Sequence, residues 1–458
     1  MMFAELNRKI LLLLDSGNER TKNVKKNILL SVCIKGGSIL LTLVLVPLTI
    51  GYVNPERYGI WLTISSVITW FNFFDLGLGN GLRNRLVTSL AANDLVKSRS
   101  LISTAYTTLA VISVFLALVF YLINTNLQWS ILLGVSDNYR DEILEVVNVI
   151  SLLFCVQFVL QLINTIFFAF QKPAMVSATF FIGNLLSCFF IYMLKLSGAG
   201  SLLWLGVAFF AGNLISLALF SIHFFYFSRP DLSPVLKLFS KNEVRHIFSL
   251  GSSFFIIQIG AIMQYQTANI MISHYMSPVD VTEYNIAFKL FSVVSMVFNI
   301  LITPIWSAST DAMVKGDYAW FVSLETKLLG IWRKLSVSVV LILILSPIFY
   351  KIWVGDAVHV SLQTSIGIAL YVIALTFSMI YVNILNGMGV VKVQFYLSII
   401  TIIFFVPLAY LLVEYYKLGL LGISIALILA NLNGLIAAPL QFKKILKAKI
   451  GPGTIDKG

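Results

Sequence analysis

The chain has 458 residues, of which 59% are hydrophobic and only 11% are charged, and its mean hydropathy is +0.91. A soluble protein of this length would carry about 25% charged residues, so the composition excludes a soluble globular protein. The net charge of +12 is compatible with nucleic-acid binding, but its distribution along the chain indicates membrane topology instead, as described below.

Twelve long apolar stretches separated by short polar gaps dominate the sequence. A helix needs roughly 20 apolar residues to cross about 30 Å of hydrocarbon. Backbone amides inside lipid must be hydrogen-bonded within their own segment, so each stretch is predicted to be helical. The sequence therefore predicts an all-α polytopic membrane protein with about 12 transmembrane helices, at residues 28–50, 58–82, 101–123, 143–170, 174–194, 202–227, 247–275, 286–309, 328–349, 362–385, 393–413 and 418–440.

The basic residues lie mainly on one side of this topology. Of the 32 Lys and Arg residues, 25 fall in the tails and loops of one side and five on the other. Basic loops stay cytoplasmic, so both termini are predicted to be inside and the number of spans to be even. Residues 1–27 do not resemble a cleavable signal peptide, because the apolar run at residues 10–14 is too short. We expect that run to lie at the cytoplasmic membrane surface.

The longest polar break between spans, residues 228–246, divides the chain into six spans plus six. The predicted organisation is a cytoplasmic tail (1–27), an N-terminal six-helix bundle (28–227), this linker, a C-terminal six-helix bundle (247–441) and a basic cytoplasmic tail (442–458). The halves are faintly alike, since Tyr52-Val53-Asn54-Pro55 follows the first span and Tyr275-Met276-Ser277-Pro278 follows the seventh. Parallel repeats of this kind place a binding site between the halves.

Polar residues recur at helical spacing on several spans. Lys35, Ser38 and Thr42 share one face of the first span. Such a stripe on one helix is explained by interhelical hydrogen bonds, whereas stripes on several helices favour a shared wet cavity. The predicted binding residues are Lys35, Ser38, Asp75, Arg83, Arg85, Gln266, Asn269, Lys289 and Asn299.

The ionisable residues inside the spans are Lys35, Asp75 and Lys289, with Arg83 and Arg85 at the inner end of the second span. Lys35 and Asp75 each lie eight residues from the cytoplasmic boundary, which is roughly 12 Å at 1.5 Å per residue. An ion pair between them is geometrically feasible. Two interpretations stay open: a pair that fixes helix packing, or a cation that receives an anionic group with Asp75 setting its position.

No catalytic, metal or cofactor site is predicted. The three cysteines, at positions 33, 155 and 188, all fall inside predicted spans without a CxxC spacing, which is typical of apolar filling rather than redox or metal chemistry. The four histidines are scattered without paired ligand spacing.

The segment from Tyr58-Gly59-Ile60-Trp61 to Asp75-Leu76-Gly77-Leu78-Gly79-Asn80-Gly81-Leu82 resembles the bacterial polysaccharide-transport family, which contains O-antigen and capsule repeat-unit flippases. That family belongs to the multidrug/oligosaccharidyl-lipid/polysaccharide exporter superfamily. The resemblance implies two bundles around a V-shaped, MATE-like cavity in the bacterial cytoplasmic membrane. It also implies alternating-access transfer of an undecaprenyl-diphosphate-linked oligosaccharide, as in lipopolysaccharide or capsule synthesis, with polysaccharide polymerase or export proteins as possible partners beside the membrane lipids.

The related lipid II flippases carry basic cavity residues on the first, second and eighth spans. By position, Lys35 and Lys289 fall on matching spans, whereas the second span carries the acid Asp75. The basic residues of the second span are therefore Arg83 and Arg85, which under this resemblance would serve at the cytoplasmic mouth of the cavity.

Two other functions were weighed. A cation-coupled multidrug exporter of the same superfamily would need carboxylates for organic cations, but the first span offers Lys35. A membrane-embedded polysaccharide-processing enzyme would need clustered reactive side chains on an outer loop, and the longest such loop, residues 124–142, has no histidine. The sequence therefore predicts a transporter rather than an enzyme or a nucleic-acid-binding protein.

Overall fold

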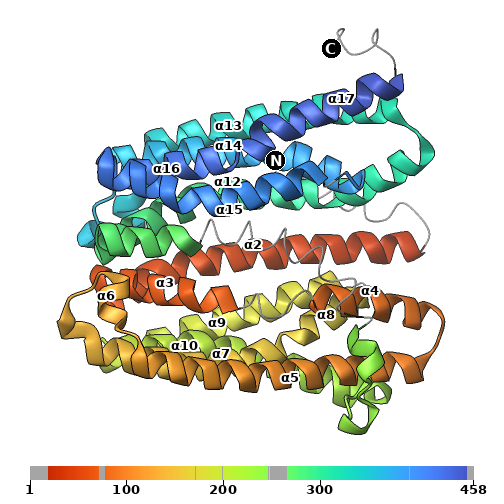
Figure 1. Cartoon of the computed structure of the whole chain (residues 1–458), viewed down its shortest axis with the longest axis horizontal. Coiled ribbons are helices and arrows are strands. Elements are labelled where there is room, and N and C mark those ends of the chain that lie inside the picture. The colour runs from red at the N-terminus through yellow and green to blue at the C-terminus, as the bar shows by residue number, and fades with distance from the viewer. Residues whose placement is uncertain are drawn as a thin grey trace, which may run out of the picture.

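A computed structural model describes residues 19–71, 78–170, 172–198, 200–245, 247, 266–390 and 392–450. Every regular element among these residues is a helix, in agreement with the all-α prediction. Figure 1 shows two layers of long helices, one from each half of the chain, with α2 lying between them.

The N-terminal half packs around one large hydrophobic cluster, which begins at Leu45 and also takes in Ile286, Tyr350, Val354 and Val358 from the C-terminal half. Its helices are α2 (Glu19–Val53), α3 (Pro55–Trp70), α4 (Leu78–Ala91), α5 (Leu95–Asn126), α6 (Trp129–Leu133), α7 (Arg140–Leu160), α8 (Leu162–Ala169), α9 (Pro173–Ser197) and α10 (Leu202–Ile222).

The C-terminal half has two further clusters, one around Tyr284 and Tyr371 and one around Phe321 and Phe442. Residues 266–275 are helical. The helices that follow are α12 (Pro278–Lys315), α13 (Tyr318–Val354), α14 (Leu362–Gly387), α15 (Lys392–Tyr410), α16 (Gly419–Ala430) and α17 (Ala438–Ile450).

Nine helices in the described part are long and apolar enough to cross a membrane, or ten when the pair bent by 43° near residue 431 counts as one span. The predicted spans 58–82 and 247–275 both include residues outside the described ranges.

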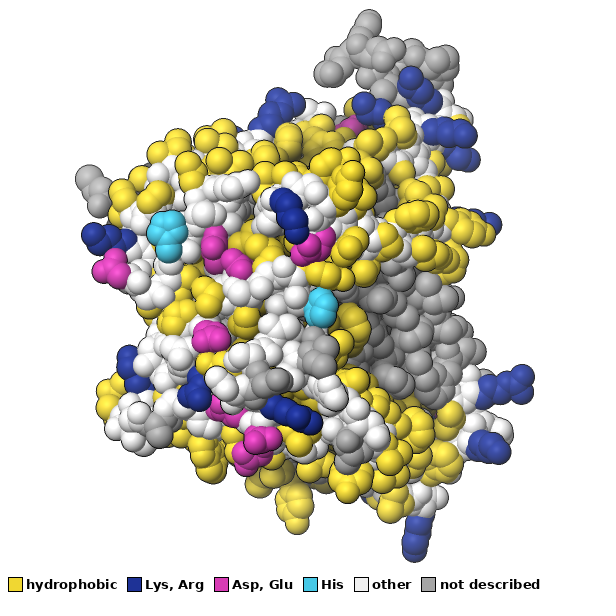
Figure 2. Space-filling view, turned by 60° about the vertical axis from the view of Figure 1, so that its left-hand side comes forward, with side chains coloured by type: hydrophobic (Ala, Val, Ile, Leu, Met, Phe, Trp, Pro, Cys, Tyr) yellow, Lys and Arg dark blue, Asp and Glu magenta, His cyan; other side chains and the backbone are white. Residues whose placement is uncertain are grey.

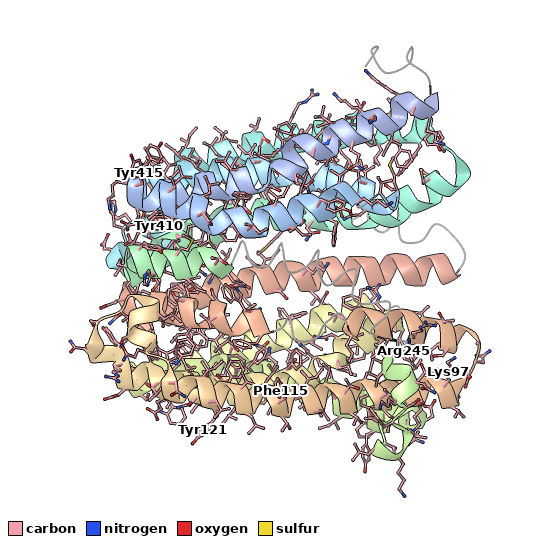
Figure 3. All side chains as sticks on the ribbon, in the orientation of Figure 1. Lys97, Phe115, Tyr121, Arg245, Tyr410 and Tyr415 are labelled. Carbon is pink, nitrogen blue, oxygen red and sulfur yellow. The ribbon has the colours of Figure 1, made fainter. Side chains whose placement is uncertain are left out.

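The outer faces of the helices agree with a lipid environment: Ile344, Ile348 and Ile352 recur every four residues on α13, and all are exposed. On α5, Phe115 and Tyr121 point away from the molecule (Figure 3). Exposed apolar faces this large require lipid, and the chain is a multi-pass membrane protein.

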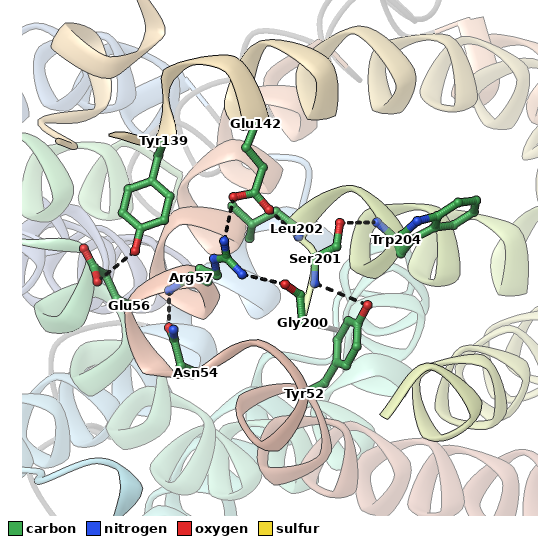
Figure 4. Close-up of polar contacts among 10 residues, drawn as sticks. All are labelled: Tyr52, Asn54, Glu56, Arg57, Tyr139, Glu142, Gly200, Ser201, Leu202 and Trp204. Carbon is green, nitrogen blue, oxygen red and sulfur yellow. Dashed lines mark hydrogen bonds and ion pairs between the residues drawn. The ribbon is translucent and has the colours of Figure 1, made fainter. Parts of the chain in front are cut away.

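One end of the N-terminal half is fastened by a polar network (Figure 4). The Arg57 guanidinium donates to one carboxylate oxygen of Glu142 at 3.1 Å, and the backbone N–H of Leu202 donates to the other at 3.0 Å. The Tyr139 hydroxyl donates to Glu56. Burial raises the pKa of Tyr139 and the bond to Glu56 raises it further, so the phenol stays a neutral donor. The network ties the starts of α3, α7 and α10 together.

The C-terminal half makes a corresponding connection. Glu283 directly precedes Tyr284, as Arg57 directly precedes Tyr58 in the first half. The Glu283 carboxylate accepts from the Ser361 backbone N–H at 3.0 Å and from the Thr364 hydroxyl at 2.6 Å, both at the start of α14. In each half, the start of the second span is therefore joined to the start of the fourth. This repeated contact agrees with the parallel repeat seen in the sequence.

Candidate functional site

A cavity of about 310 Å³ lies where α2 and α9 of the N-terminal half face α12 of the C-terminal half. The lining combines one cation, three hydroxyls and one amide with apolar side chains. The residues are Lys35, Ser38, Ile39 and Thr42 from α2, Ser177 and Phe180 from α9, and Met296 and Asn299 from α12.

Helical geometry explains why α2 contributes most of this lining. Lys35, Ser38 and Thr42 are separated by three and four residues, so their side chains project from one face. The Thr42 hydroxyl donates to the Ser38 carbonyl at 2.8 Å. In contrast, the Ser38 hydroxyl is buried and has no hydrogen-bond partner among the described residues. Lys35 is exposed and makes no ion pair with any described residue. An ammonium group and a hydroxyl are thus available to a ligand.

Two of the predicted residues lie instead in a closed interface between the halves. The Lys289 ammonium donates to the Tyr58 hydroxyl at 2.7 Å and lies 5.5 Å from the centroid of the Tyr58 ring. The Asn269 amide donates to Ser66 at 2.8 Å, and its oxygen accepts from Asn285 at 2.8 Å. Both contacts join α3 to the C-terminal half.

The same interface is packed closely along its length. The Thr282 hydroxyl donates to the Pro55 carbonyl at 2.6 Å. Gly59 lies so close to Pro278 that a Cβ atom there would overlap the Pro278 carbonyl oxygen. On the far side of α2, the Trp353 indole N–H donates to the Leu43 carbonyl at 2.8 Å. The two halves are therefore held together at the end that carries the α2–α3 loop.

The other predicted residues are spread along the molecule. Arg83, on α4, is exposed and lies 5.0 Å from the ring centroid of Phe168. The Nε atom of Arg85 is buried and has no hydrogen-bond partner among the described residues. Gln266 is partly buried at the first described position of its helix. Asp75 lies outside the described residues, so its pairing with Lys35 stays a prediction. Of the nine predicted residues, the cavity brings together Lys35, Ser38 and Asn299.

Sequence patterns did not identify several residues that line the cavity or lie in the closed interface. Ser177 and Phe180 line the cavity from α9, where the helical spacing of Ser177, Asn184 and Ser187 is the signal that indicates this face. In the sequence, Tyr58 stands out only as the first residue of the segment that carries the family resemblance. Its side chain is 2% exposed, and burial of a phenol beside a lysine depends on tertiary packing that spacing does not show.

The contact between Lys289 and Tyr58 predicts a measurable coupling. Tyr58→Phe keeps the ring and removes the hydroxyl that accepts from the partly buried ammonium, so we expect the unfolding free energy to fall by about 1–3 kcal/mol. Lys289→Met removes the charge while retaining the chain length. If the bond matters, the double variant will lose less than the sum of the two single losses, as a double-mutant cycle in detergent-solubilised protein would measure. Additive losses would contradict this coupling.

Comparison with known proteins identifies a matching family and two relatives of this chain. The family model described as "Polysaccharide biosynthesis protein" matches residues 24–308. A protein of Yersinia pseudotuberculosis named as an O-antigen export protein is 22% identical over 307 residues, which cover 63% of this chain and 66% of the relative. A protein of Salmonella typhi named as an O-antigen transporter is 21% identical over 60% of this chain and 62% of its own length. The chain thus spans just under two thirds of the curated relatives it matches.

Among solved structures, the inward-facing form of a multidrug resistance MATE family transporter of the MOP superfamily superposes with a TM-score of 0.77 at 15% identity, over 93% of this chain and 99% of that chain. The outward-facing form of such a transporter gives a TM-score of 0.65 at 16% identity, over 93% and 97% of the two chains. These likenesses establish a MATE-like fold of two helical bundles, as the sequence predicted. Since the family model also covers more than half of the chain, the protein belongs to the polysaccharide biosynthesis protein family.

Proposed function

We propose that this protein is a flippase for an undecaprenyl-diphosphate-linked oligosaccharide repeat unit, which it moves from the inner to the outer leaflet of the bacterial cytoplasmic membrane. The observation that carries the proposal is the cavity between the halves, which Lys35 lines beside Ser38, with no ion pair to Lys35 and no hydrogen bond to the Ser38 hydroxyl from any described residue. A lysine ammonium attracts phosphate as a point charge, and hydroxyl and amide groups meet the hydroxyls of a sugar. Relatives named for O-antigen export support the same substrate class.

The size and composition of the cavity limit what it holds. At about 310 Å³ it lies at the lower end of small-molecule sites, so it fits a diphosphate and the adjoining sugar rather than a whole repeat unit. We assign the phosphates to Lys35 and Ser38 and the first sugar to Asn299 and Ser177. Phe180 and Met296 give the lining an apolar part, which suits the part of the lipid next to the diphosphate. The other predicted binding residues, Asp75, Arg83, Arg85 and Gln266, remain candidates for contacts outside this cavity.

Transfer to the outer leaflet requires the closed interface to separate. In the structure, α3 is joined to α12 through Tyr58–Lys289 and to the helix at residues 266–275 through Ser66–Asn269. Alternating access then consists of opening these contacts while the opposite end closes around α2 and α12. Once freed from Tyr58, the Lys289 ammonium would face the opening between the halves, where it can meet the same anionic headgroup that Lys35 binds.

The distribution of charge supports one orientation of the chain in the membrane. Figure 2 shows acidic, basic and histidine side chains gathered together on the end of the molecule that carries the α2–α3 loop, whereas Lys and Arg protrude at the opposite end. Basic loops are retained in the cytoplasm, so we place that opposite end, both termini and the cavity mouth on the cytoplasmic side. The closed interface then faces outward.

The alternative of a cation-coupled multidrug exporter has less support from the cavity. A site for organic cations needs carboxylates, and the residues that line the described cavity include a lysine and no acid. A membrane-embedded processing enzyme remains the third candidate, and nothing in the cavity favours it.

The decisive experiment reconstitutes the full chain in proteoliposomes with a lectin-binding disaccharide on undecaprenyl diphosphate. We expect the lectin-accessible fraction of the lipid to change with time only in vesicles that contain the protein. The same saccharide on a neutral polyprenyl ether should move at least tenfold more slowly, because it lacks the phosphates. Vesicles that transport ethidium along an ion gradient but leave the saccharide lipid in place would replace this proposal with the drug-exporter alternative.

A further inference from the structure

The linker between the halves is fixed to the first turns of α5. The Arg99 guanidinium donates to the Ser233 carbonyl at 2.9 Å, and the Ser100 hydroxyl donates to the Leu238 carbonyl at 3.0 Å. In the opposite direction, the linker backbone N–H of Ser240 donates to Thr104 at 3.0 Å. These bonds recur over eight linker residues, so the segment is a rigid part of the N-terminal half rather than a loose connection.

Other contacts hold the beginning of the linker. Leu232 is fully buried in the N-terminal hydrophobic cluster. Arg229 forms an ion pair with Asp231 at 2.7 Å and lies 5.4 Å from the ring centroid of Phe170. The Arg229 guanidinium lowers the pKa of Asp231 through their hydrogen bonds and its charge, so this pair is intact at neutral pH. The charge of Arg229 is thereby compensated within the linker.

The outer side of this segment exposes apolar and basic residues together. Leu236 is 77% exposed and Val96, at the start of α5, is 76% exposed, with Leu95 and Phe239 also exposed. The four exposed cations of this surface, Lys97, Lys237, Lys241 and Arg245, outnumber the two nearby acids, Asp94 and Glu243. We call this surface the linker shelf; its residues are Leu95, Val96, Lys97, Leu236, Lys237, Phe239, Lys241 and Arg245.

The linker shelf continues a surface that already faces lipid. Tyr226 and Phe227, at the end of the span that leads into the linker, are 78% and 72% exposed. Aromatic side chains are typical of the membrane–water interface. In Figure 3, Lys97 and Arg245 lie at the same end of the molecule, and the linker projects sideways beyond α5, which is itself lipid-facing. These exposed aromatic side chains favour a position of the shelf at the depth of the lipid headgroups, and the shelf lies beside the bundle.

We propose that the linker shelf binds the anionic phospholipid headgroups of the cytoplasmic leaflet. Leu236 and Phe239 enter the boundary between headgroups and acyl chains, while Lys237, Lys241 and Arg245 contact phosphates. An anionic leaflet is the occupant that suits both features, because apolar side chains gain burial and clustered cations gain counter-charges. The shelf anchors the N-terminal half to the cytoplasmic leaflet. The proposal uses the orientation given above but not the transported substrate.

The test places the full chain in nanodiscs, whose two leaflets are identical, so its outcome does not depend on the proposed orientation or on transport. In a background without Cys33, Cys155 and Cys188, Leu236→Cys carries an environment-sensitive fluorophore. We expect quenching by lipids with a nitroxide near the headgroup and protection from iodide. We also expect that phosphatidylglycerol, compared with phosphatidylcholine alone, raises the thermal midpoint of the unlabelled protein by several degrees.

A matched pair of variants isolates the charge. The triple variant K237Q/K241Q/R245Q should lose most of the rise caused by phosphatidylglycerol. The control K195Q/K351Q, which neutralises exposed lysines at the other end, should keep it. A fluorophore quenched by iodide but not by the nitroxide lipids would overturn the proposal, since the shelf would then face water and suit a protein partner. An undiminished lipid effect in the triple variant would overturn it as well.

Discussion

Gly59→Ala is expected to prevent the outer ends of the two halves from closing. An added Cβ would overlap the carbonyl of Pro278, and the Thr282 hydroxyl is also within 3.0 Å. The main obstacle, the Pro278 carbonyl, is backbone in the first turn of α12, so it cannot move aside as the end of a flexible side chain could. Overpacking of this kind costs about 1–3 kcal/mol, which shifts the ratio of closed to open molecules by about 5–150-fold. We expect at least a tenfold fall in transport of the saccharide lipid.

Thiol reactivity reports the conformational change directly. Ser273 is fully buried in the same interface and donates to the Leu133 carbonyl. In a background without native cysteines, Ser273→Cys should be unreactive toward a membrane-impermeant thiol reagent and become reactive when combined with Gly59→Ala. The matched control is Gly330→Ala, where an added Cβ meets no atom within 4 Å. Equal reactivity in the two backgrounds would show that this close approach does not limit closure.

The residues predicted from the sequence coincide with the lining of the cavity mainly on one helix, for a physical reason. Helical periodicity alone places Lys35, Ser38 and Thr42 on one face, and the structure assigns that face to the cavity with Asn299 opposite. Periodicity does not say whether a polar face meets water or another helix. Lys289 and Asn269 were chosen by the same criterion, and they hydrogen-bond across the closed interface to Tyr58 and Ser66, which come from a distant part of the chain.

The linker is a second case in which the sequence pattern did not predict which groups a polar segment contacts. Its composition predicted a polar connection between the halves but not its attachment. Polar side chains at the start of the third span, including Ser100, Ser103 and Thr104, were not interpreted from the sequence. In the structure they bond to backbone groups of the linker that would otherwise need water. A cluster of hydroxyls at the end of an apolar span can thus indicate a docked loop as well as a substrate path.

Lys35→Ala is expected to abolish most transport without lowering the amount of folded protein. Lys35 is exposed and makes no ion pair among the described residues, so its removal should change the unfolding free energy by no more than about 0.5 kcal/mol. A hydrogen bond from a charged group to phosphate contributes about 1.5–3 kcal/mol, which corresponds to about a 10–150-fold loss in headgroup affinity. Surface glycan should fall at least tenfold while the lipid-linked repeat unit accumulates. Lys35→Arg should retain part of the activity, since it keeps the charge but changes its geometry.

Lys289 provides the comparison that separates binding from closure. Lys289→Ala should also reduce glycan display, and because it additionally loses the contact with Tyr58, the Ser273→Cys probe should become more reactive. With Lys35→Ala that probe should stay protected and only the affinity for the headgroup should fall. Lys195→Ala, at an exposed lysine outside the cavity, should behave like the parent protein. Normal glycan display by Lys35→Ala would remove the cation from the proposed site, because no other lysine or arginine among the described residues lines the cavity.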